Sequence, residues 1–218
     1  MKKYKLTDKS IIYNGHTLYE IEAITDFGYI MAGTKGGYIE SENNLSHCGY
    51  CWIADNAKVY DNAIIRGNAF VCDNAKVYGN AAIHGNVRIF GDSIIYEDAS
   101  IHGNAKIYGN ARVFGCTFVY NNATIYDNAQ VYGCAIVKGH AEICKDAIVC
   151  KKEDYIIFKN WWSSGRFFTW TRSNNMWKVG CFSGTGEELI TKAYKDSELS
   201  GREYERIVKY VESIIKEE

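Results

Sequence analysis

The chain has 218 residues, of which 47% are hydrophobic and 23% charged, the composition of a folded protein of one or two domains. Its 25 lysines and arginines nearly balance its 26 aspartates and glutamates, so a nucleic-acid partner is not expected, because such proteins usually carry a basic surplus. No apolar stretch approaches the roughly 18 residues of a membrane span, and no apolar core of a signal peptide follows the basic start. We therefore expect no membrane partner and a cytoplasmic location, with the eight cysteines reduced.

Residues 1–50 are predicted to form an N-terminal β cap. Residues 11–13 and 17–24 have the pattern of two strands, and Asn14 and Gly15 between them are the pair typical of a two-residue hairpin turn. The segment that follows leads into a regular repeat.

Residues 51–152 repeat with a period of six. A valine or isoleucine stands at every sixth position from Ile53 to Val149, seventeen times without an insertion, and a small residue such as Ala57 precedes most of them by two places. Because residues i and i−2 of a strand point to the same side, each hexad sends one small and one branched side chain inward. A helix with 3.6 residues per turn cannot keep a period of six on one face. The repeat therefore predicts short strands joined by tight corners, which is a parallel β-helix.

Glycine, aspartate or asparagine follows most strands, at the places where a corner can require a positive φ angle. If three hexads make one coil, residues 18 apart lie above one another. The three predicted corner columns are Asn56, Asn74, Asp92, Asn110, Asn128 and Asp146; Asn62, Asn80, Asp98, Cys116 and Cys134; and Asn68, Asn86, Asn104, Asn122 and His140. Asparagine tolerates this backbone conformation and can bond its stacked neighbour, so the columns are expected to be structural.

The outer faces of the predicted β-helix differ in chemistry. One carries an aromatic column of Tyr60, Tyr78, Tyr96, Phe114 and Tyr132. Stacking of this kind stabilises a sheet by roughly 0.2–1 kcal/mol per pair. Another, called the third face below, carries an apolar strip of Ile64, Ala82, Phe118 and Ile136. This strip is expected to be an oligomer or packing surface, covered either by a partner or by the terminal segments.

Residues 153–218 are predicted to form a small α+β module. Strands are expected at 155–160, 166–172 and 176–182 as a three-stranded meander. Two helices follow, at 186–195 and from Ser200, which would form a capping box with Glu203.

The module also contains an aromatic and cationic cluster. Its candidate binding residues are Trp161, Trp162, Arg166, Trp170, Arg172 and Trp177. Tryptophan and arginine are enriched where interfaces concentrate their binding energy. The alternative is that several of these tryptophans fill the core of the module, because a small domain needs bulky side chains.

The repeat NAKVYD NAIIRG NAFVCD resembles those of the left-handed β-helix hexapeptide-repeat superfamily, in which three hexads form one triangular coil. With the segments ITDFGYIMAGTKGGYIE and CWIADNAKVYDNA, residues 20–150 also resemble hexapeptide-repeat transferases related to the enterobacterial YdcK protein, and repeat proteins carried by phages and prophages. The implied fold class is mainly β. It is a left-handed parallel β-helix of about six 18-residue coils, with an N-terminal β-hairpin cap and a small C-terminal α+β domain.

The resemblance also implies a chemistry. Members of the superfamily transfer acyl groups from acyl-CoA or acyl carrier protein, with a histidine as general base at the seam between trimer subunits. His84 and His102, one coil apart on the third face, are the candidate catalytic residues. The loop that walls off the substrate in such transferases has no counterpart in the seventeen hexads. A homo-oligomer, a trimer first and a dimer second, is expected on the same resemblance.

No metal site and no cofactor are expected. Cys48 and Cys51 with His47 supply half of a zinc-binding pattern, but a structural zinc needs four ligands and no second CxxC follows. Cys116 and Cys134 stack at one corner, where they could form a disulfide or a small buried column.

These observations favour a non-catalytic scaffold that binds a protein through its C-terminal module and solenoid faces. The resemblance suggests a phage or prophage origin and a bacterial host protein, such as a defence component, as the partner. One alternative is an acyltransferase that uses acyl-CoA with a face histidine as general base. A second alternative is a protein that sequesters a small molecule or nucleotide between its subunits.

Overall fold

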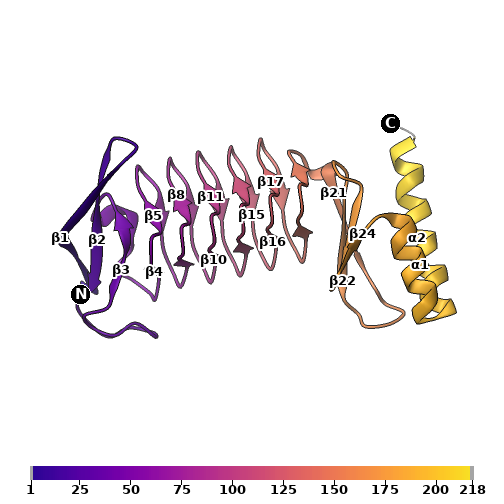
Figure 1. Ribbon diagram of the computed structural model, residues 1–218, viewed down its shortest axis with the longest axis horizontal. Helices are drawn as coiled ribbons and strands as arrows, with labels where there is room; N and C mark the ends of the chain where they lie inside the picture. Colours follow the sequence, from indigo (N-terminus) through magenta and orange to yellow (C-terminus); the bar gives the residue numbers. More distant parts are fainter. Residues whose placement is uncertain (1, 217–218) are drawn as a thin grey trace.

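The computed structural model describes residues 2–216 as a rod of stacked coils with a cap at each end (Figure 1). The N-terminal cap consists of β1 (Tyr4–Tyr13), β2 (His16–Ala23), β3 (Lys35–Ile39) and the short 3-10 helix η1 (Glu42–Asn44). Strands β1 and β2 pair as an antiparallel hairpin. Asn14 and Gly15 at its turn have φ angles of 50° and 86°, as a two-residue hairpin turn requires. The predicted hairpin is confirmed; its first strand is longer than predicted, and its second begins and ends one residue earlier.

Between the caps, strands of two residues each build three parallel sheets. They are β4 (Trp52–Ile53), β5 (Lys58–Val59), β6 (Ile64–Ile65), β7 (Phe70–Val71), β8 (Lys76–Val77), β9 (Ala82–Ile83), β10 (Arg88–Ile89), β11 (Ile94–Ile95), β12 (Ser100–Ile101), β13 (Lys106–Ile107), β14 (Arg112–Val113), β15 (Phe118–Val119), β16 (Thr124–Ile125), β17 (Gln130–Val131), β18 (Ile136–Val137), β19 (Glu142–Ile143) and β20 (Ile148–Val149). Every third strand belongs to the same sheet, and β3 extends the first sheet at its N-terminal edge. The inward residues, such as Ala57 and Val59, are fully buried. The predicted parallel β-helix is confirmed.

The corners have the predicted backbone conformation. Every sixth residue from Asp55 to Lys145 has a φ angle between 55° and 90°. Glycine, aspartate or asparagine occupies all of these positions except Glu97 and Lys145. At Gly85 a Cβ atom would lie 2.8 Å from the carbonyl oxygen of Gly103 in the next coil, so a side chain there would press on the neighbouring corner.

The predicted asparagine columns are present as hydrogen-bonded ladders. The Asn68 amide donates to Asn86 and the Asn86 amide to Asn104, both at 3.0 Å, and the other two corners repeat the pattern. Corner carboxylates add further bonds, since the Asp61 side chain accepts from the N–H of Gly79 at 3.1 Å. The columns are therefore structural, as expected.

Outside the two-residue strands, the backbone hydrogen bonds between coils point in one direction. The N–H groups of one coil donate to carbonyls of the next, as from Lys58 to Ala75 at 3.0 Å. At these positions the first coil presents carbonyls that need donors from outside the solenoid, and the last coil presents N–H groups that need acceptors. The two caps have to supply different groups there.

The N-terminal cap supplies donors. The N–H of Tyr38 in β3 donates to the carbonyl of Ala57 at 2.9 Å. The side-chain amide of Asn44, which is fully buried, donates to the carbonyls of Asp61 and Ala63 at 2.9 Å each. Asn44 thus satisfies two carbonyls of the first coil, which has no preceding coil to donate to them.

The C-terminal module supplies acceptors, one hydroxyl for each face of the solenoid. The N–H groups of Lys138, Glu142 and Ile148 donate to the hydroxyls of Tyr155, Thr169 and Ser173 at 3.2, 3.0 and 2.7 Å, respectively. The module is therefore docked as the closing element of the rod.

The sheet of this module has one strand more than predicted. It consists of β21 (Tyr155–Lys159), β22 (Phe167–Thr171), β23 (Met176–Val179) and β24 (Phe182–Gly184), paired antiparallel in that order. The third predicted strand is split because Gly180 has a φ angle of 56°, and the chain turns back so that Val179 pairs with Phe182.

Helices α1 (Gly186–Asp196) and α2 (Glu198–Lys216) lie against the side of the sheet that faces away from the coils (Figure 1). The second helix begins before the predicted Ser200. The hydroxyl of Ser197 accepts from the N–H of Ser200 at 3.1 Å. Ser197, and not Ser200, is therefore the N-cap residue of this helix. Phe168, Trp170 and Trp177 form the core between sheet and helices with Leu189, Ala193, Tyr204, Val208 and Val211. Neither helix of the described chain is long and apolar enough to cross a membrane.

The polarity of the N-terminal cap can be tested with Asn44→Asp. This change keeps the shape of the side chain but turns a donor toward the two carbonyls into an acceptor. We expect the free energy of unfolding to fall by at least about 2 kcal/mol, since an unsatisfied buried polar group costs about 1–3 kcal/mol and a charged one more. Urea denaturation measures the loss. Asn43→Asp, at the exposed neighbouring position, is the control and should change stability by less than about 0.5 kcal/mol; equal stabilities of the two variants would contradict the donor role.

Candidate functional site

The apolar strip of the third face is not covered by either cap within the described residues. Strands β6, β9, β12, β15 and β18 stack in register on this face. Of the strip residues, Ile64 and Ala82 are partly buried by their neighbours, whereas Phe118 is 46% and Ile136 38% exposed. Within residues 2–216, the terminal segments therefore leave Phe118 and Ile136 uncovered.

The two candidate catalytic histidines lie together beside this strip. The rings of His84 and His102 stack with centroids 4.9 Å apart and planes 2° from parallel, and His102 stacks in turn on Tyr120. The predicted spacing of one coil is confirmed. A shallow apolar hollow of about 400 Å³, lined by Ile64, Ala82 and His84 among others, lies next to them.

Within residues 2–216, the histidine pair lacks the orienting group of a general base. Burial, and then the neighbouring His84, lower the pKa of His102. Within residues 2–216, neither imidazole has a hydrogen-bond or ion-pair partner that would orient it. A general base needs both reach and an orienting group. The geometry places two stacked rings on an open face.

The aromatic and cationic cluster of the module divides into core and surface. Trp170 and Trp177 are 1% and 2% exposed, so they fill the core, as the alternative interpretation held, and are not on a binding surface. Trp162 packs edge-on against the ring of Tyr204 with centroids 5.0 Å apart. It is partly buried against the core, which again reflects the need of a small domain for bulky side chains.

The other members of the cluster are on the surface. Trp161 is 73% exposed and Arg166 is exposed. The guanidinium of Arg172 lies 5.8 Å from the ring of Trp170, and its Nε donates to the carbonyl of Glu153. Trp161, Arg166 and Arg172 are therefore the cluster residues that a partner can reach.

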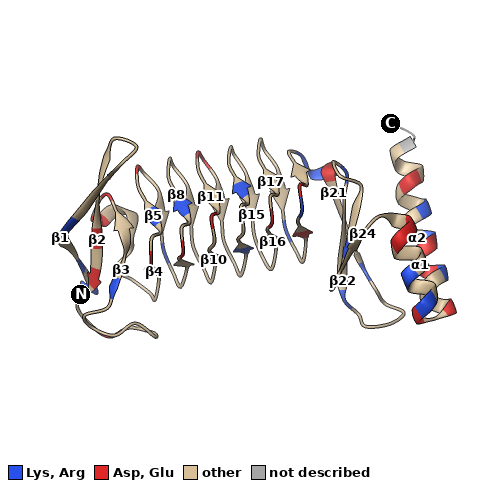
Figure 2. Cartoon of the chain, in the orientation of Figure 1, with Lys and Arg blue, Asp and Glu red and all other residues tan. Residues whose placement is uncertain are grey.

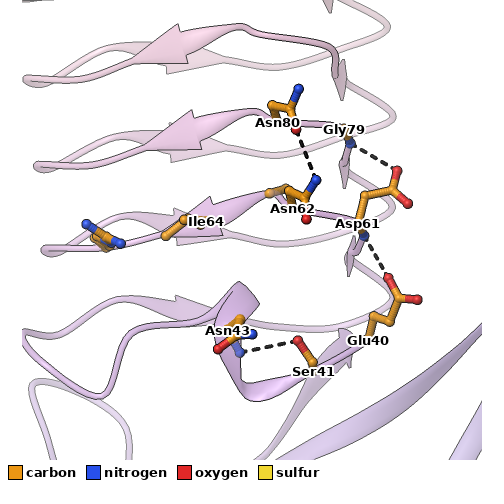
Figure 3. Close-up of a pocket in the computed structure, with 10 residues that line it drawn as sticks. Glu40, Ser41, Asn43, Asp61, Asn62, Ile64, Gly79 and Asn80 are labelled. Atoms are coloured by element: carbon orange, nitrogen blue, oxygen red, sulfur yellow. Dashed lines mark hydrogen bonds between the residues drawn. The ribbon is translucent and has the colours of Figure 1, made fainter.

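A polar groove of about 800 Å³ lies at the N-terminal end of the rod, where η1 meets the first corners (Figure 3). The Glu40 carboxylate accepts from the N–H of Asp61 at 2.8 Å, and Asp61 accepts from Gly79 (Figure 3). Just behind them, His16 lies with Nδ1 3.0 Å from Glu40 Oε1 and Nε2 3.4 Å from Asp61 Oδ1. Because each ring nitrogen faces a carboxylate, a protonated imidazole would be bonded to Glu40 and paired with Asp61. The ligand atoms of the same three side chains also lie within 4.8 Å of one another, close enough to hold a metal ion.

The sequence did not point to this cluster. His16 begins β2, Glu40 follows β3 and Asp61 is a corner residue, so only the folding of the hairpin onto the first coil brings them together. The one local signal was the Asn14 and Gly15 turn, which places His16 at a hairpin end.

The cysteines are free throughout the described chain. Cys51 is buried, and its Sγ lies 3.3 Å from the ammonium of Lys3, which also donates to the Cys51 carbonyl. Cys116 and Cys134 stack at one corner as predicted, but they are exposed and unbonded, so they form neither a disulfide nor a buried column. The Cys134 thiol is the main cause that raises the pKa of Cys116.

Acidic and basic residues are interspersed along the solenoid and over both helices (Figure 2). On α2 they pair locally, with Lys209 2.6 Å from Glu205 and Arg206 2.9 Å from Glu203. Exposed pairs of this kind contribute little to stability.

The His16 contacts predict a pH dependence. The hydrogen bond to Glu40 is the main cause that raises the pKa of His16 above 6.5. A group whose pKa is higher in the folded state stabilises the fold below the unfolded pKa, and this contribution is lost as pH rises through the folded pKa. The melting temperature of the wild type should therefore exceed that of His16→Asn near pH 6, and the difference should shrink by pH 8.5. A difference that is constant over this range would show that the imidazolium is not involved.

Two comparisons with known proteins bear on the repeat. Residues 118–133 match the family described as the YdcK β-solenoid repeat. The uncharacterized acetyltransferase YdcK of Escherichia coli (strain K12) is 38% identical over an alignment of 77 residues, which covers 31% of this chain and 24% of that protein. The chain thus aligns with about a quarter of its curated relative. Together with the stacked hexads of the structure, these matches show that the chain has the repeat and the fold of the hexapeptide-repeat β-helix superfamily.

Proposed function

We propose that this protein is a non-catalytic scaffold that binds a protein partner on the third face of its solenoid. The observation that carries the proposal is the exposed apolar strip. Phe118 and Ile136 keep 46% and 38% of their surface exposed on a sheet whose neighbours are locked in register. Soluble monomers rarely expose contiguous apolar patches, and those that they do expose often mark interaction sites.

The surroundings of the strip suit a broad contact better than a small substrate. The stacked rings of His84, His102 and Tyr120 run parallel to it, and the hollow beside them is open and shallow. Aromatic residues are enriched in the centres of protein interfaces, where they supply large contact area. The rigid ladder keeps these groups in one plane before a partner arrives, which lowers the entropic cost of binding.

The partner is proposed to be a protein of a bacterial host, on the resemblance of the repeat to phage-carried proteins. Trp161 and Arg166 on the C-terminal module would extend the contact. A second copy of the chain is the other occupant that the strip would fit, and a trimer or dimer would bury it.

The strip can be tested with Ile136→Asp. A carboxylate at this position should reduce capture of a partner from host lysate, or self-association measured by light scattering, at least about tenfold, because a desolvated unpaired charge costs several kcal/mol at an interface. Ile148→Asp is the matched control, since Ile148 is also 38% exposed but lies on another face. Equal binding by both variants would exclude the third face.

An acyltransferase is the second candidate, favoured by the name of the curated relative and by the histidine pair. If the protein is an acyltransferase, the full chain should bind acetyl-CoA in calorimetry, and His84→Ala or His102→Ala should lower turnover of an acyl acceptor by about 100-fold or more. If it is a scaffold, no acetyl-CoA binding should be measured, and both variants should bind the partner within a few fold of the wild-type affinity.

A further inference from the structure

A separate cavity lies in the C-terminal module, away from the third face. It has a volume of about 300 Å³ and is enclosed by the hairpin loop between β21 and β22, the turn between β23 and β24, and helices α1 and α2. This is the lower end of the range for small-molecule sites. Its polar lining includes Ser163, Ser164, Arg166, Lys192, Asp196 and Ser200.

One wall of the cavity is held in place by Asn160. This residue is only 6% exposed. Its amide nitrogen donates to the hydroxyl of Tyr204 on α2 at 2.9 Å, and its side-chain oxygen accepts from the N–H of Ser163 at 2.9 Å. Its backbone N–H donates to the carbonyl of Arg166 at 2.8 Å. The loop that carries Arg166 is therefore fixed to the helix across the cavity, and the site is formed before any ligand binds.

The guanidinium of Arg166 rests against Gly180. A Cβ atom on Gly180 would lie 3.2 Å from Nη1 of Arg166, which is closer than most side chains approach one another. The glycine therefore leaves the space that the guanidinium occupies. The position also needs glycine for its φ angle of 56°.

The cations of the cavity are not neutralised by the protein. Across residues 2–216, neither Arg166 nor Lys192 forms an ion pair with a carboxylate. Asp196 contributes the one carboxylate of the lining, so two positive charges stand against one negative charge. The donor groups of the guanidinium are left for something outside the chain.

We propose that this cavity binds a small polar molecule through a phosphate or carboxylate group held by Arg166, with Lys192 as the second cation. A guanidinium offers two parallel N–H donors that match the paired oxygens of either group. The hydroxyls of Ser163, Ser164 and Ser200, together with Asp196, are placed to bond hydroxyl groups on the rest of the ligand. This site shares Arg166 with the partner contact proposed above, whereas its other residues lie outside that contact.

The test compares three probes that share a three-carbon polyol. Glycerol 3-phosphate carries a phosphate, glycerate carries a carboxylate, and glycerol carries neither. Each is titrated into the ¹⁵N-labelled full chain, and the Nε–Hε signal of Arg166 and the amide signals of Ser163 and Gly180 are followed. We expect saturable shifts with at least one anion and none with glycerol; the anion that binds identifies the chemistry of the ligand.

Variants then assign the binding to the cavity. Arg166→Gln should weaken the binding of that anion by about tenfold or more, and Lys192→Gln should weaken it less, because an ammonium is a single point charge. Arg206→Gln removes the same charge from the far side of α2 and should leave the affinity unchanged. Melting temperatures confirm that each variant is folded. The proposal is overturned if neither anion produces saturable shifts, or if Arg166→Gln and wild type bind equally.

Discussion

The hydrogen bonding of each coil to the next governs the rest of the structure. At the positions outside the strands, these bonds run from the N–H groups of one coil to the carbonyls of the next, so there the rod ends in carbonyls on one side and in N–H groups on the other. Buried backbone groups without partners are costly, and an open edge invites pairing with other chains. The buried Asn44 amide at one end and the hydroxyls of Tyr155, Thr169 and Ser173 at the other answer these two needs. The caps are therefore not interchangeable, although both are built from antiparallel strands.

The same repetition limits what the solenoid faces can do. Side chains 18 residues apart stack at a spacing of one strand, so a face can present columns but not a deep cleft. The aromatic column from Tyr60 to Tyr132 and the asparagine ladders use this spacing for stability. The third face uses it differently, because its strip and its histidines remain open to solvent. The groove beside η1 and the C-terminal cavity are lined by several elements, and both lie where the repeat stops.

Periodicity explains which parts of the candidate sites could be predicted. The stacking of His84 on His102 follows from a separation of 18 residues and needs no other knowledge of the fold. The exposure of Cys116 and Cys134 could not be predicted in the same way, because a corner residue can point inward or outward. In the module, alternation along a strand distinguishes two sides but does not say which side a helix covers. For this reason Trp170 and Trp177 were indistinguishable from the exposed Trp161 until the helices were placed.

The sequence by itself determined the solenoid, because a period of six with inward alanine, valine and isoleucine requires short strands joined by corners, and most of those corners carry glycine, aspartate or asparagine. It also determined the hairpin at Asn14 and Gly15, since that turn has a local signature. The tertiary structure alone decided the contacts between segments far apart in the chain. The bonds from His16 to Glu40 and Asp61, the split of the third module strand at Gly180, and the cavity around Arg166 all depend on how caps dock and helices pack. Such contacts do not follow the repeat, so no spacing in the sequence predicts them.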